Sequence, residues 1–327
     1  MNAESFRKRS GAGENSNRDD AAGTSKEISL SSSVKFSCEP RNKANDRKEL
    51  YYKSLSTLKR LGYPSSQGIV DSAMSDIGAL INLPPRLLGV LPSSRGLVAG
   101  DISLSILNAE SSIPSLILDT KAFGNECCPI PGDIAALSYD KTIVKSSAQL
   151  VLIVEKDAIF QKIIDDGILE HLKPCLLITG RGYPDVSTRR LLHIIWKCLE
   201  IPIMALVDAD PHGIEIMLVY RFGSLAMSKD ADELAVPSVR WLGVHPSDIP
   251  NLGLPTQSLL PLGKEGTAKA EALLTRPYVQ AHPNIYKEVA AMIKYQCKAE
   301  IEALNLLSST YVTDVYIPGK LSTKNVF

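Results

Sequence analysis

Two aspartates separated by a single residue, Asp208 and Asp210, follow an apolar run in the segment LVDADPHGIEIM at residues 206–217. A glutamate, Glu155, follows another apolar run in QLVLIVEK at residues 149–156. In a parallel α/β sheet, ligands bind beyond the carboxyl ends of the strands, and residues two apart on an extended strand point to the same side. We therefore expect the three carboxylates to face one site.

Three carboxylates that converge on one site repel one another and raise each other's pKa unless a cation lies between them. Oxygen ligands favour a hard divalent ion, so the site predicts Mg²⁺ or Mn²⁺, half hydrated and bound jointly with a phosphate. The alternative is that the acids cap helices or pair with Lys and Arg, which is the commoner role of an isolated Asp-X-Asp. The presence of Glu155 at the end of a separate strand favours the metal site.

Apolar segments typical of buried strands alternate along the chain with amphipathic segments typical of helices. The expected strands lie at residues 149–156, 175–179 and 202–209, and the expected helices at 157–172, 187–201 and 213–223. This alternation predicts an α/β fold with a parallel sheet and right-handed crossovers. Ser187 is expected to be the N-cap of the helix at 187–201. A further strand is expected at 240–244 and a long helix at 284–305.

The first third of the chain has a different pattern. Residues 1–46 are polar and without periodicity, which indicates a disordered basic tail, and residues 1–60 carry a net charge of +5 while the rest carries −5. Residues 47–62 and 68–85 have helical spacing, and residues 86–104 are expected to form a strand, a turn and a strand. Helix, helix and hairpin is the order of a winged-helix domain, expected at 47–105.

Composition limits the class of protein. The 327 residues, 44% of them hydrophobic, can form one large domain or two smaller ones. No apolar run reaches the ~20 residues of a membrane span, and the N-terminus lacks the apolar core of a secretory signal, so we expect no membrane partner and an intracellular protein. The six cysteines form no Cys-X-X-Cys motif and are expected to be reduced. Residues 106–145 are expected to be a linker or insertion.

The arrangement of one Glu and an Asp-X-Asp at strand ends resembles the Toprim domain of topoisomerases, primases and some nucleases. The segments KELYY, VEKDAIFQ, TGRGYPDVSTR, LVDADPHGIEIM, RWLGVHPSDI and KAEIEAL, in this order, resemble the A subunit of topoisomerase VI and its eukaryotic meiotic relatives. The resemblance covers residues 48–320, and the motifs GYPD and DADPHG are more similar to those of the meiotic members. It implies a winged-helix domain followed by a Toprim domain at 146–327 with a C-terminal helical extension.

The resemblance also implies an activity. The family contains type IIB topoisomerase-like enzymes, whose meiotic members make the DNA double-strand breaks that start recombination on chromosomes in the nucleus. It implies Mg²⁺ as cofactor and double-stranded DNA as substrate. The implied partners are a second copy of the chain, the B-type ATPase subunit of topoisomerase VI, and meiotic accessory proteins. The chain itself has no glycine loop for ATP, because GRGYPD lacks the GK[ST] of a Walker motif.

Residue roles follow by position in the matching motifs. Tyr52 matches the nucleophile, which would remain linked to a DNA 5′-phosphate, and Tyr51 would be structural. The acids that match the metal ligands are Glu155, Asp208 and Asp210. His212 is expected to be structural.

Several basic residues are expected to contact DNA phosphates. Lys48 stands where the family usually has Arg, and an ammonium and a guanidinium bind phosphate differently. The other expected phosphate contacts are Arg47, Arg95 and Arg181, and the alternative for Arg95 and Arg181 is a solvated loop charge. A second departure is that residues 26–46 lack the apolar helices that family members usually have before the tyrosine motif, so the winged-helix domain is expected to be incomplete.

Three alternative functions remain open on the sequence. The chain could be a DNA-binding assembly subunit without cleavage, because of Lys48 and the altered N-terminus. It could be a Toprim nuclease that uses water, in which case Tyr52 would be dispensable. It could also be a topoisomerase VI A-type subunit that acts outside meiosis.

Overall fold

The computed structural model describes residues 45–64, 66–81, 83, 85–88, 90–91, 93–107, 114–124, 126–172, 174–323 and 326–327. The chain divides into two compact units, which are described separately. The first contains Lys48–Leu88, and the second contains Ala44–Arg47 and Gly89–Phe327. The tail expected at 1–46 lies outside the described residues except for its last two.

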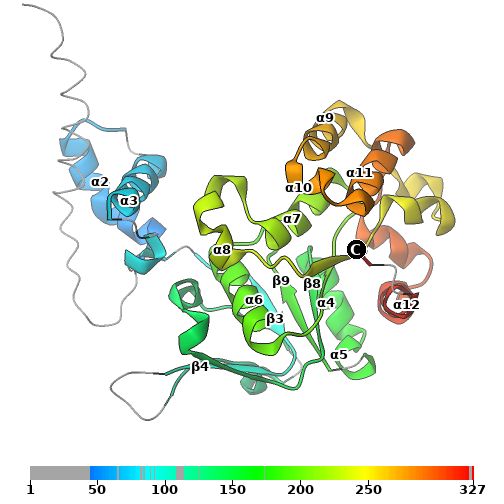
Figure 1. The fold of residues 1–327 in the computed structure, drawn as a ribbon, viewed down its shortest axis with the longest axis horizontal. Helices are drawn as coiled ribbons and strands as arrows, with labels where there is room; N and C mark the ends of the chain where they lie inside the picture. Colours follow the sequence, from blue (N-terminus) through cyan, green and yellow to red (C-terminus); the bar gives the residue numbers. More distant parts are fainter. Residues whose placement is uncertain are drawn as a thin grey trace, which may run out of the picture. The chain divides into compact units, whose positions relative to one another are not determined.

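A six-stranded sheet forms the centre of the second unit (Figure 1). Its order is β11 (Val239–Gly243), β10 (Ile203–Leu206), β8 (Leu150–Val154), β9 (Cys175–Thr179), β3 (Leu97–Ala99) and β6 (Cys128–Pro129). The first four strands are parallel, and β3 and β6 are antiparallel to their neighbours. Every residue of β8, β9 and β10 is buried, as expected for parallel strands covered on both faces. The predicted α/β class and parallel sheet are confirmed.

Helices cover the two faces of this sheet (Figure 1). On one face, Val151 and Ile153 share an apolar cluster with α6 (Val186–Leu199) and α7 (Pro211–Phe222). On the other, Leu152 and Val154 pack in a cluster with α4 (Asp157–Asp165). The alternation of side chains along a strand thus places the two halves of the core.

Local details of the helices differ from the sequence prediction. The helix expected at 157–172 breaks at Gly167, which has a φ of 80°, before a short α5 (Ile168–His171). The N-cap of α6 is Asp185, whose carboxylate accepts a hydrogen bond from the Thr188 N–H, and the prediction of Ser187 was wrong. The carboxylate of Asp185 presents an acceptor oxygen at the turn, whereas the Ser187 hydroxyl donates to the carbonyl of Gly132.

The long helix expected at 284–305 is wrong beyond its first half. Helix α11 spans Pro283–Tyr295 and ends at Gln296, whose φ is 52°. The chain then forms β13 (Cys297–Lys298), antiparallel to β12 (Leu260–Pro261). Remaining helices of this region are α8 (Ala231–Leu234), α9 (Gly263–Leu274), α10 (Pro277–Gln280) and α12 (Ile317–Thr323).

The remaining helical segments among the described residues are 3₁₀ or π in type. The 3₁₀ segments are Pro85–Leu88, Thr120–Phe123, Gly132–Ala136, Tyr139–Lys141, Leu225–Asp230, Pro246–Asn251, Thr256–Ser258 and Ile301–Leu306, and the π segment is Val312–Tyr316. None of the five cysteines in the described part of the chain forms a disulfide, and Cys38 lies outside it.

The two helices expected in this part of the chain are present, α2 (Arg47–Arg60), which belongs to the first unit from Lys48 onward, and α3 (Gln67–Ile81). The strand–turn–strand hairpin expected at 86–104 is wrong. Strand β2 (Val90–Leu91) pairs with β1 (Asn45–Asp46), whereas β3 pairs with β9. All three residues of β3 are buried, and a two-stranded wing could not cover both of its faces. The winged-helix domain at 47–105 stays a prediction.

The segment 106–145, expected to be a linker or insertion, contains strands among its described residues. Strand β4 (Ile102–Ile106) pairs with β5 (Ser115–Asp119) and β7 (Thr142–Ser146) in a three-stranded antiparallel sheet. Strand β6 from the same region forms the edge of the main sheet. The segment therefore contributes strands to the second unit, although residues 108–113 and 125 lie outside the described ones.

Candidate metal centre at the carboxyl edge of the sheet

The strand order places β8 and β10 side by side at the point where the sheet changes direction. From β8 the chain crosses to β9 on one side, and from β10 to β11 on the other. Ligand sites in open α/β sheets lie at such a point, beyond the carboxyl ends of the strands. Glu155 directly follows β8 and Asp208 lies two residues after β10. Because β8 and β10 are neighbours, Glu155 and Asp208 lie at the same edge of the sheet, as predicted.

Glu155 and Asp208 are joined through the backbone and are almost fully buried. The Glu155 Oε2 atom accepts a hydrogen bond of 2.8 Å from the Asp208 N–H, and Asp208 Oδ1 accepts one of 2.8 Å from the Ile301 N–H. Burial raises the pKa of both carboxyl groups, and the negative charge of Asp208 raises that of Glu155 further. Among the described residues, no salt bridge reaches Glu155, and the nearby charge of Lys156 only partly opposes the rise of its pKa.

Asp210 has a second role as the N-cap of α7. Its Oδ1 atom accepts hydrogen bonds from the His212 N–H at 2.6 Å and the Gly213 N–H at 3.0 Å, where the helix dipole also favours negative charge. Burial alone would raise the pKa of Asp210. The Gly213 N–H and the Lys298 ammonium outweigh burial and hold the pKa below its usual value.

Gly213 lets the helix approach the acids closely. A Cβ atom at this position would lie 2.6 Å from the Asp208 carbonyl oxygen and 2.8 Å from Glu155 Oε2. Both distances are too short for any side chain. The Gly of the DPHG segment is therefore part of the geometry that holds the carboxylates together.

Two lysines that the sequence prediction missed neutralise the aspartates. The Lys156 Nζ atom lies 3.0 Å from Asp208 Oδ2, and it also contacts Glu300 at 3.3 Å and Glu302 at 2.8 Å. Their signal in the sequence is the position of Lys156 next to Glu155 and the alternation of charges in KAEIEAL at 298–304.

The second of these lysines, Lys298, lies with its Nζ atom 3.1 Å from Asp210 Oδ2. In this structure, therefore, both aspartates pair with lysine and Asp210 also caps a helix, which is the alternative to a metal site. In the described part of the chain, no group of three or more His, Cys, Asp and Glu side chains is arranged as a metal cluster.

The donor set nevertheless fits a hard divalent ion. It offers only carboxylate oxygens, the kind of ligand that Mg²⁺ prefers. Two of the acids are buried with raised pKa values, and Glu155 forms no salt bridge among the described residues. A cation at this edge would remove the repulsion between the carboxylates, provided that the Lys156 and Lys298 ammonium groups move aside.

The loop after β9 is tied to the same edge. The Gly182 N–H donates to the Glu155 carbonyl at 2.9 Å, and Arg181, with a φ of 55°, pairs through Nε with Asp157 at 3.2 Å. The guanidinium of Arg95 donates to the Tyr183 carbonyl at 3.3 Å. Arg181 therefore lies on the loop after β9, and Arg95, which precedes β3, contacts this loop.

Tyr183 and His212 lie beside the aspartates. The Tyr183 hydroxyl donates to Glu215 and lies 3.3 Å from His212 Nδ1. Glu215 is paired in turn with Lys269 at 2.6 Å and with Arg276. His212 thus contacts Asp210 through its backbone and packs against Tyr183, as a structural residue would.

Tyr52 lies on α2 in the first unit, and 68% of its surface is exposed. Its ring centroid lies 5.3 Å from that of the half-buried Tyr51. Lys48 is exposed on the same helix, and the side chain of Arg47 lies outside the described residues. The roles predicted for these residues stay predictions.

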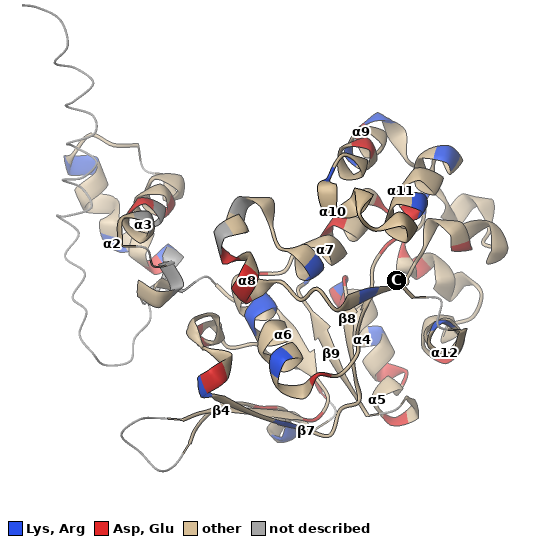
Figure 2. Cartoon of the chain, viewed as in Figure 1, with Lys and Arg blue, Asp and Glu red and all other residues tan. Residues whose placement is uncertain are grey.

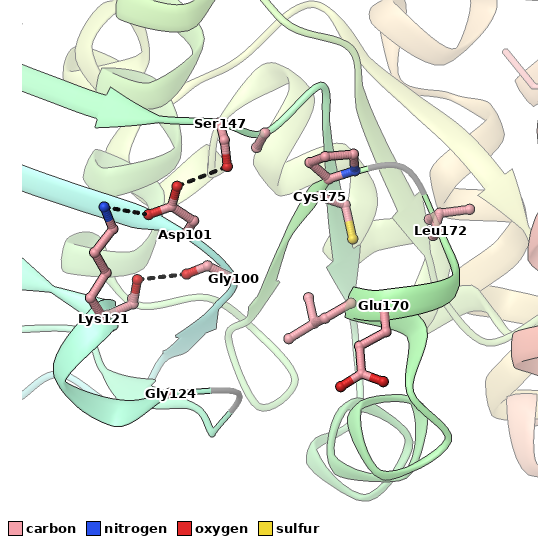
Figure 3. Close-up of a pocket in the computed structure, with 12 residues that line it drawn as sticks. Gly100, Asp101, Lys121, Gly124, Ser147, Glu170, Leu172 and Cys175 are labelled. Carbon is pink, nitrogen blue, oxygen red and sulfur yellow. Dashed lines mark hydrogen bonds and ion pairs between the residues drawn. The ribbon is translucent and has the colours of Figure 1, made fainter.

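A pocket of about 470 Å³ opens at the other end of the parallel strands (Figure 3). It is lined by residues before β8 and at the start of β9, including Ser147 and Cys175. Asp101 accepts a hydrogen bond of 2.8 Å from Ser147 and pairs with Lys121 at 3.6 Å. Because the acids follow the carboxyl ends of the same strands, this pocket is separate from the candidate metal centre.

Comparison with known proteins decides the family. The family model for the Toprim domain of the topoisomerase 6 A subunit and Spo11 matches residues 150–321, which include all three acids. The chain belongs to this family. It is the family that the sequence motifs resembled, so that prediction is confirmed.

Curated relatives of the same family match most of the chain. The "Meiotic recombination protein SPO11" of Mus musculus is 41% identical over 256 residues, which are 78% of this chain and 62% of the mouse protein. "Meiotic recombination protein SPO11-1" of Oryza sativa subsp. indica is 39% identical over 86% of this chain and 69% of its own length. The A subunit of DNA topoisomerase 6 from Arabidopsis thaliana is 31% identical over 78% of this chain and 57% of its own.

The chain therefore spans about 62% of the length of the mouse relative. None of the helices in the described part of the chain has the length and apolar character needed to cross a membrane. Figure 2 shows both basic and acidic residues on the helices around the sheet.

Proposed function

We propose that the chain is a topoisomerase-like DNA transesterase that makes the double-strand breaks of meiotic recombination. The observation that carries the proposal is that Glu155 and Asp208 lie together within a domain that matches the family's Toprim model. The backbone N–H of Asp208 donates a hydrogen bond of 2.8 Å to the Glu155 carboxylate. The meiotic role is supported by the higher identity to relatives named for meiotic recombination, 41%, than to a topoisomerase 6 A subunit, 31%. Such a protein would act on chromosomes in the nucleus.

The candidate metal centre would hold Mg²⁺ through Glu155, Asp208 and Asp210. When bound, the ion supplies positive charge that stabilises the phosphate and the leaving oxygen. The chain positions its ligands for this role through hydrogen bonds to backbone N–H groups, which fix Asp208 and Asp210 before any DNA arrives. Fixed ligands lose little freedom in the reaction, which is the basis of electrostatic catalysis.

Tyr52 would be the nucleophile. Its phenolic oxygen forms a bond to a DNA phosphorus atom while the bond from phosphorus to the 3′ oxygen breaks. The phenol loses one proton and the 3′ oxygen gains one, so the products are a 3′-hydroxyl and a 5′-phosphotyrosyl linkage. Lys48, Arg47, Arg95 and Arg181 would bind phosphates and carry little sequence information.

The 68% exposure of Tyr52 supports a reaction between two copies of the chain. In a dimer, Tyr52 of one protomer would meet the metal centre of the other, and two such sites would cut both strands. A topoisomerase VI B-type subunit would supply any ATP dependence, and meiotic accessory proteins would complete the assembly.

The chain offers a matched pair of variants to test this function, because Tyr51 and Tyr52 are adjacent. We expect Tyr52→Phe to abolish covalent protein–DNA adducts, since it removes the attacking oxygen, and Tyr51→Phe to retain them. Adducts are measured by purifying the tagged chain from meiotic cells under denaturing conditions and labelling the attached DNA ends. Adducts that persist in Tyr52→Phe would contradict the proposal. Breaks without attached protein would indicate a nuclease that uses water.

A further inference from the structure

Both aspartates of the candidate metal centre are in contact with an ammonium group. The Nζ atom of Lys156 lies 3.0 Å from Asp208 Oδ2, and that of Lys298 lies 3.1 Å from Asp210 Oδ2. A divalent ion needs oxygens of the same carboxylates. The two lysines therefore occupy positions for which a bound cation would compete.

The two lysines differ in what they would keep after such an exchange. Lys156 also contacts Glu300 at 3.3 Å and Glu302 at 2.8 Å, so it retains two acidic partners if Asp208 turns to a metal. Lys298 has Asp210 as its one acidic partner among the described residues. Exchange at Asp210 would leave the Lys298 ammonium without an acid.

The backbone holds Lys298 close to Asp210. Strand β13 pairs with β12, and the next residue, Ala299, exchanges two hydrogen bonds with Ala209, of 2.9 and 3.2 Å. Ala209 separates the two aspartates in the sequence. The lysine is thus anchored at its Cα beside the metal centre, while its side chain remains 31% exposed and can turn into solvent.

We propose that Lys298 is a built-in counter-ion of Asp210 which a divalent cation displaces, so that this lysine sets the metal affinity of the site. The inference rests on the metal centre of the proposed function. Its physical basis is that the ammonium competes for a carboxylate oxygen and also repels a second cation a few ångströms away. The lysine neutralises Asp210 until a divalent ion binds.

The test is the affinity of the full chain for Mn²⁺, a spectroscopic probe for Mg²⁺, measured from the electron paramagnetic resonance signal of the free ion. We expect Lys298→Met to bind Mn²⁺ about tenfold more tightly than the parent, which is the effect of removing one partly screened charge near the site. Lys298→Gln should give a similar gain. Thermal unfolding curves check that each variant is folded.

Lys269→Met is the matched control. Lys269 is also a partly exposed lysine in an ion pair, 2.6 Å from Glu215, but it contacts none of the three acids. We expect its Mn²⁺ affinity to stay within about twofold of the parent, because screening weakens more distant charges. An equal gain in Lys269→Met would overturn the proposal.

The outcomes separate this inference from the proposed function. If the parent binds Mn²⁺ and Asp210→Asn weakens the binding, but both Lys298 variants bind like the parent, only the inference fails. If neither the parent nor any folded variant binds Mn²⁺, the metal centre and the inference fail together.

Discussion

The three acids and Tyr52 are held by the molecule in different ways. Glu155 and Asp208 are buried at the edge of the sheet, and hydrogen bonds from distant parts of the chain hold them. Tyr52 is 68% exposed on α2 of the other compact unit. A group that must bind an ion gains from a fixed position. A group that is presented to a second molecule gains from exposure, so the difference agrees with a nucleophile that acts in trans.

The largest expected effect comes from the acids. Asp208→Asn should reduce adduct formation by about 10²–10³-fold, which is typical of removing one preorganised group that stabilises charge in the transition state. Glu302→Gln is the control, because Glu302 contacts the same Lys156 without belonging to the proposed metal ligands. It should change adduct formation by no more than about fivefold, as expected for an exposed ion pair. Equal losses in both variants would mean that Asp208 has no special role.

The second effect is on stability and comes from the close packing of Gly213 against the acids at the carboxyl edge of the sheet. Gly213→Ala should lower the free energy of unfolding by about 3 kcal/mol, the upper end of the range for overpacking, because its Cβ would meet backbone and carboxylate oxygens. Gly319→Ala in α12 is the control, since nothing lies within 4 Å of its Cβ position. It should be neutral or slightly stabilising. Urea denaturation of the two variants measures the difference, and equal stabilities would show that the edge tolerates a side chain.

A smaller effect should appear as the pH falls. His245 follows β11 at the same edge and is fully buried, with Nε2 3.2 Å from the Trp241 carbonyl and Nδ1 2.8 Å from the Lys320 ammonium. Burial and Lys320 lower the pKa of His245 to about 4, although Asp248 opposes this. Neutral His245 can accept from Lys320 through Nδ1, whereas the protonated ring cannot.

The sign of the pH effect follows from this lowered pKa. The unfolded chain takes up the proton near pH 6.5 and the folded chain only near pH 4, so the stabilisation is complete above pH 6.5 and decreases below it. Between pH 6.5 and 5 the loss should be about 2 kcal/mol. Urea denaturation at both pH values should show the advantage of the parent over His245→Gln decreasing by this amount. A constant difference would contradict the assignment.

The sequence predicted the part of the fold that depends on local pattern. The apolar strands and amphipathic helices between residues 149 and 223 indicated the parallel sheet and placed Glu155 and Asp208 at its edge. The prediction failed where pairing joins distant segments. Strand β3 looked like half of a hairpin because Ser93–Gly96 has turn composition, but its partner β9 lies about 80 residues later.

The sequence indicated where the acids would lie but not that lysines would contact them. Asp208 and Asp210 are visible as a pair at a strand end. Lys298 was hidden because residues 284–305 have helical spacing, so it was expected on a helix face. The chain instead leaves the helix at Gln296, and the bridge from Ala299 to Ala209 brings Lys298 to Asp210. Such a contact depends on tertiary structure that no local pattern encodes.

The central claim, that Tyr52 of one copy acts at the acids of another, can be tested by mixing two inactive chains. Tyr52→Phe and Asp208→Asn chains, carrying different tags, are co-expressed in meiotic cells and their covalent DNA adducts are measured separately. In a mixed dimer, the intact Tyr52 of the Asp208→Asn chain meets the intact acids of its partner. The account therefore predicts adducts on the Asp208→Asn chain alone, at levels well above either variant expressed singly. No adduct on either chain of the mixed dimer would contradict it.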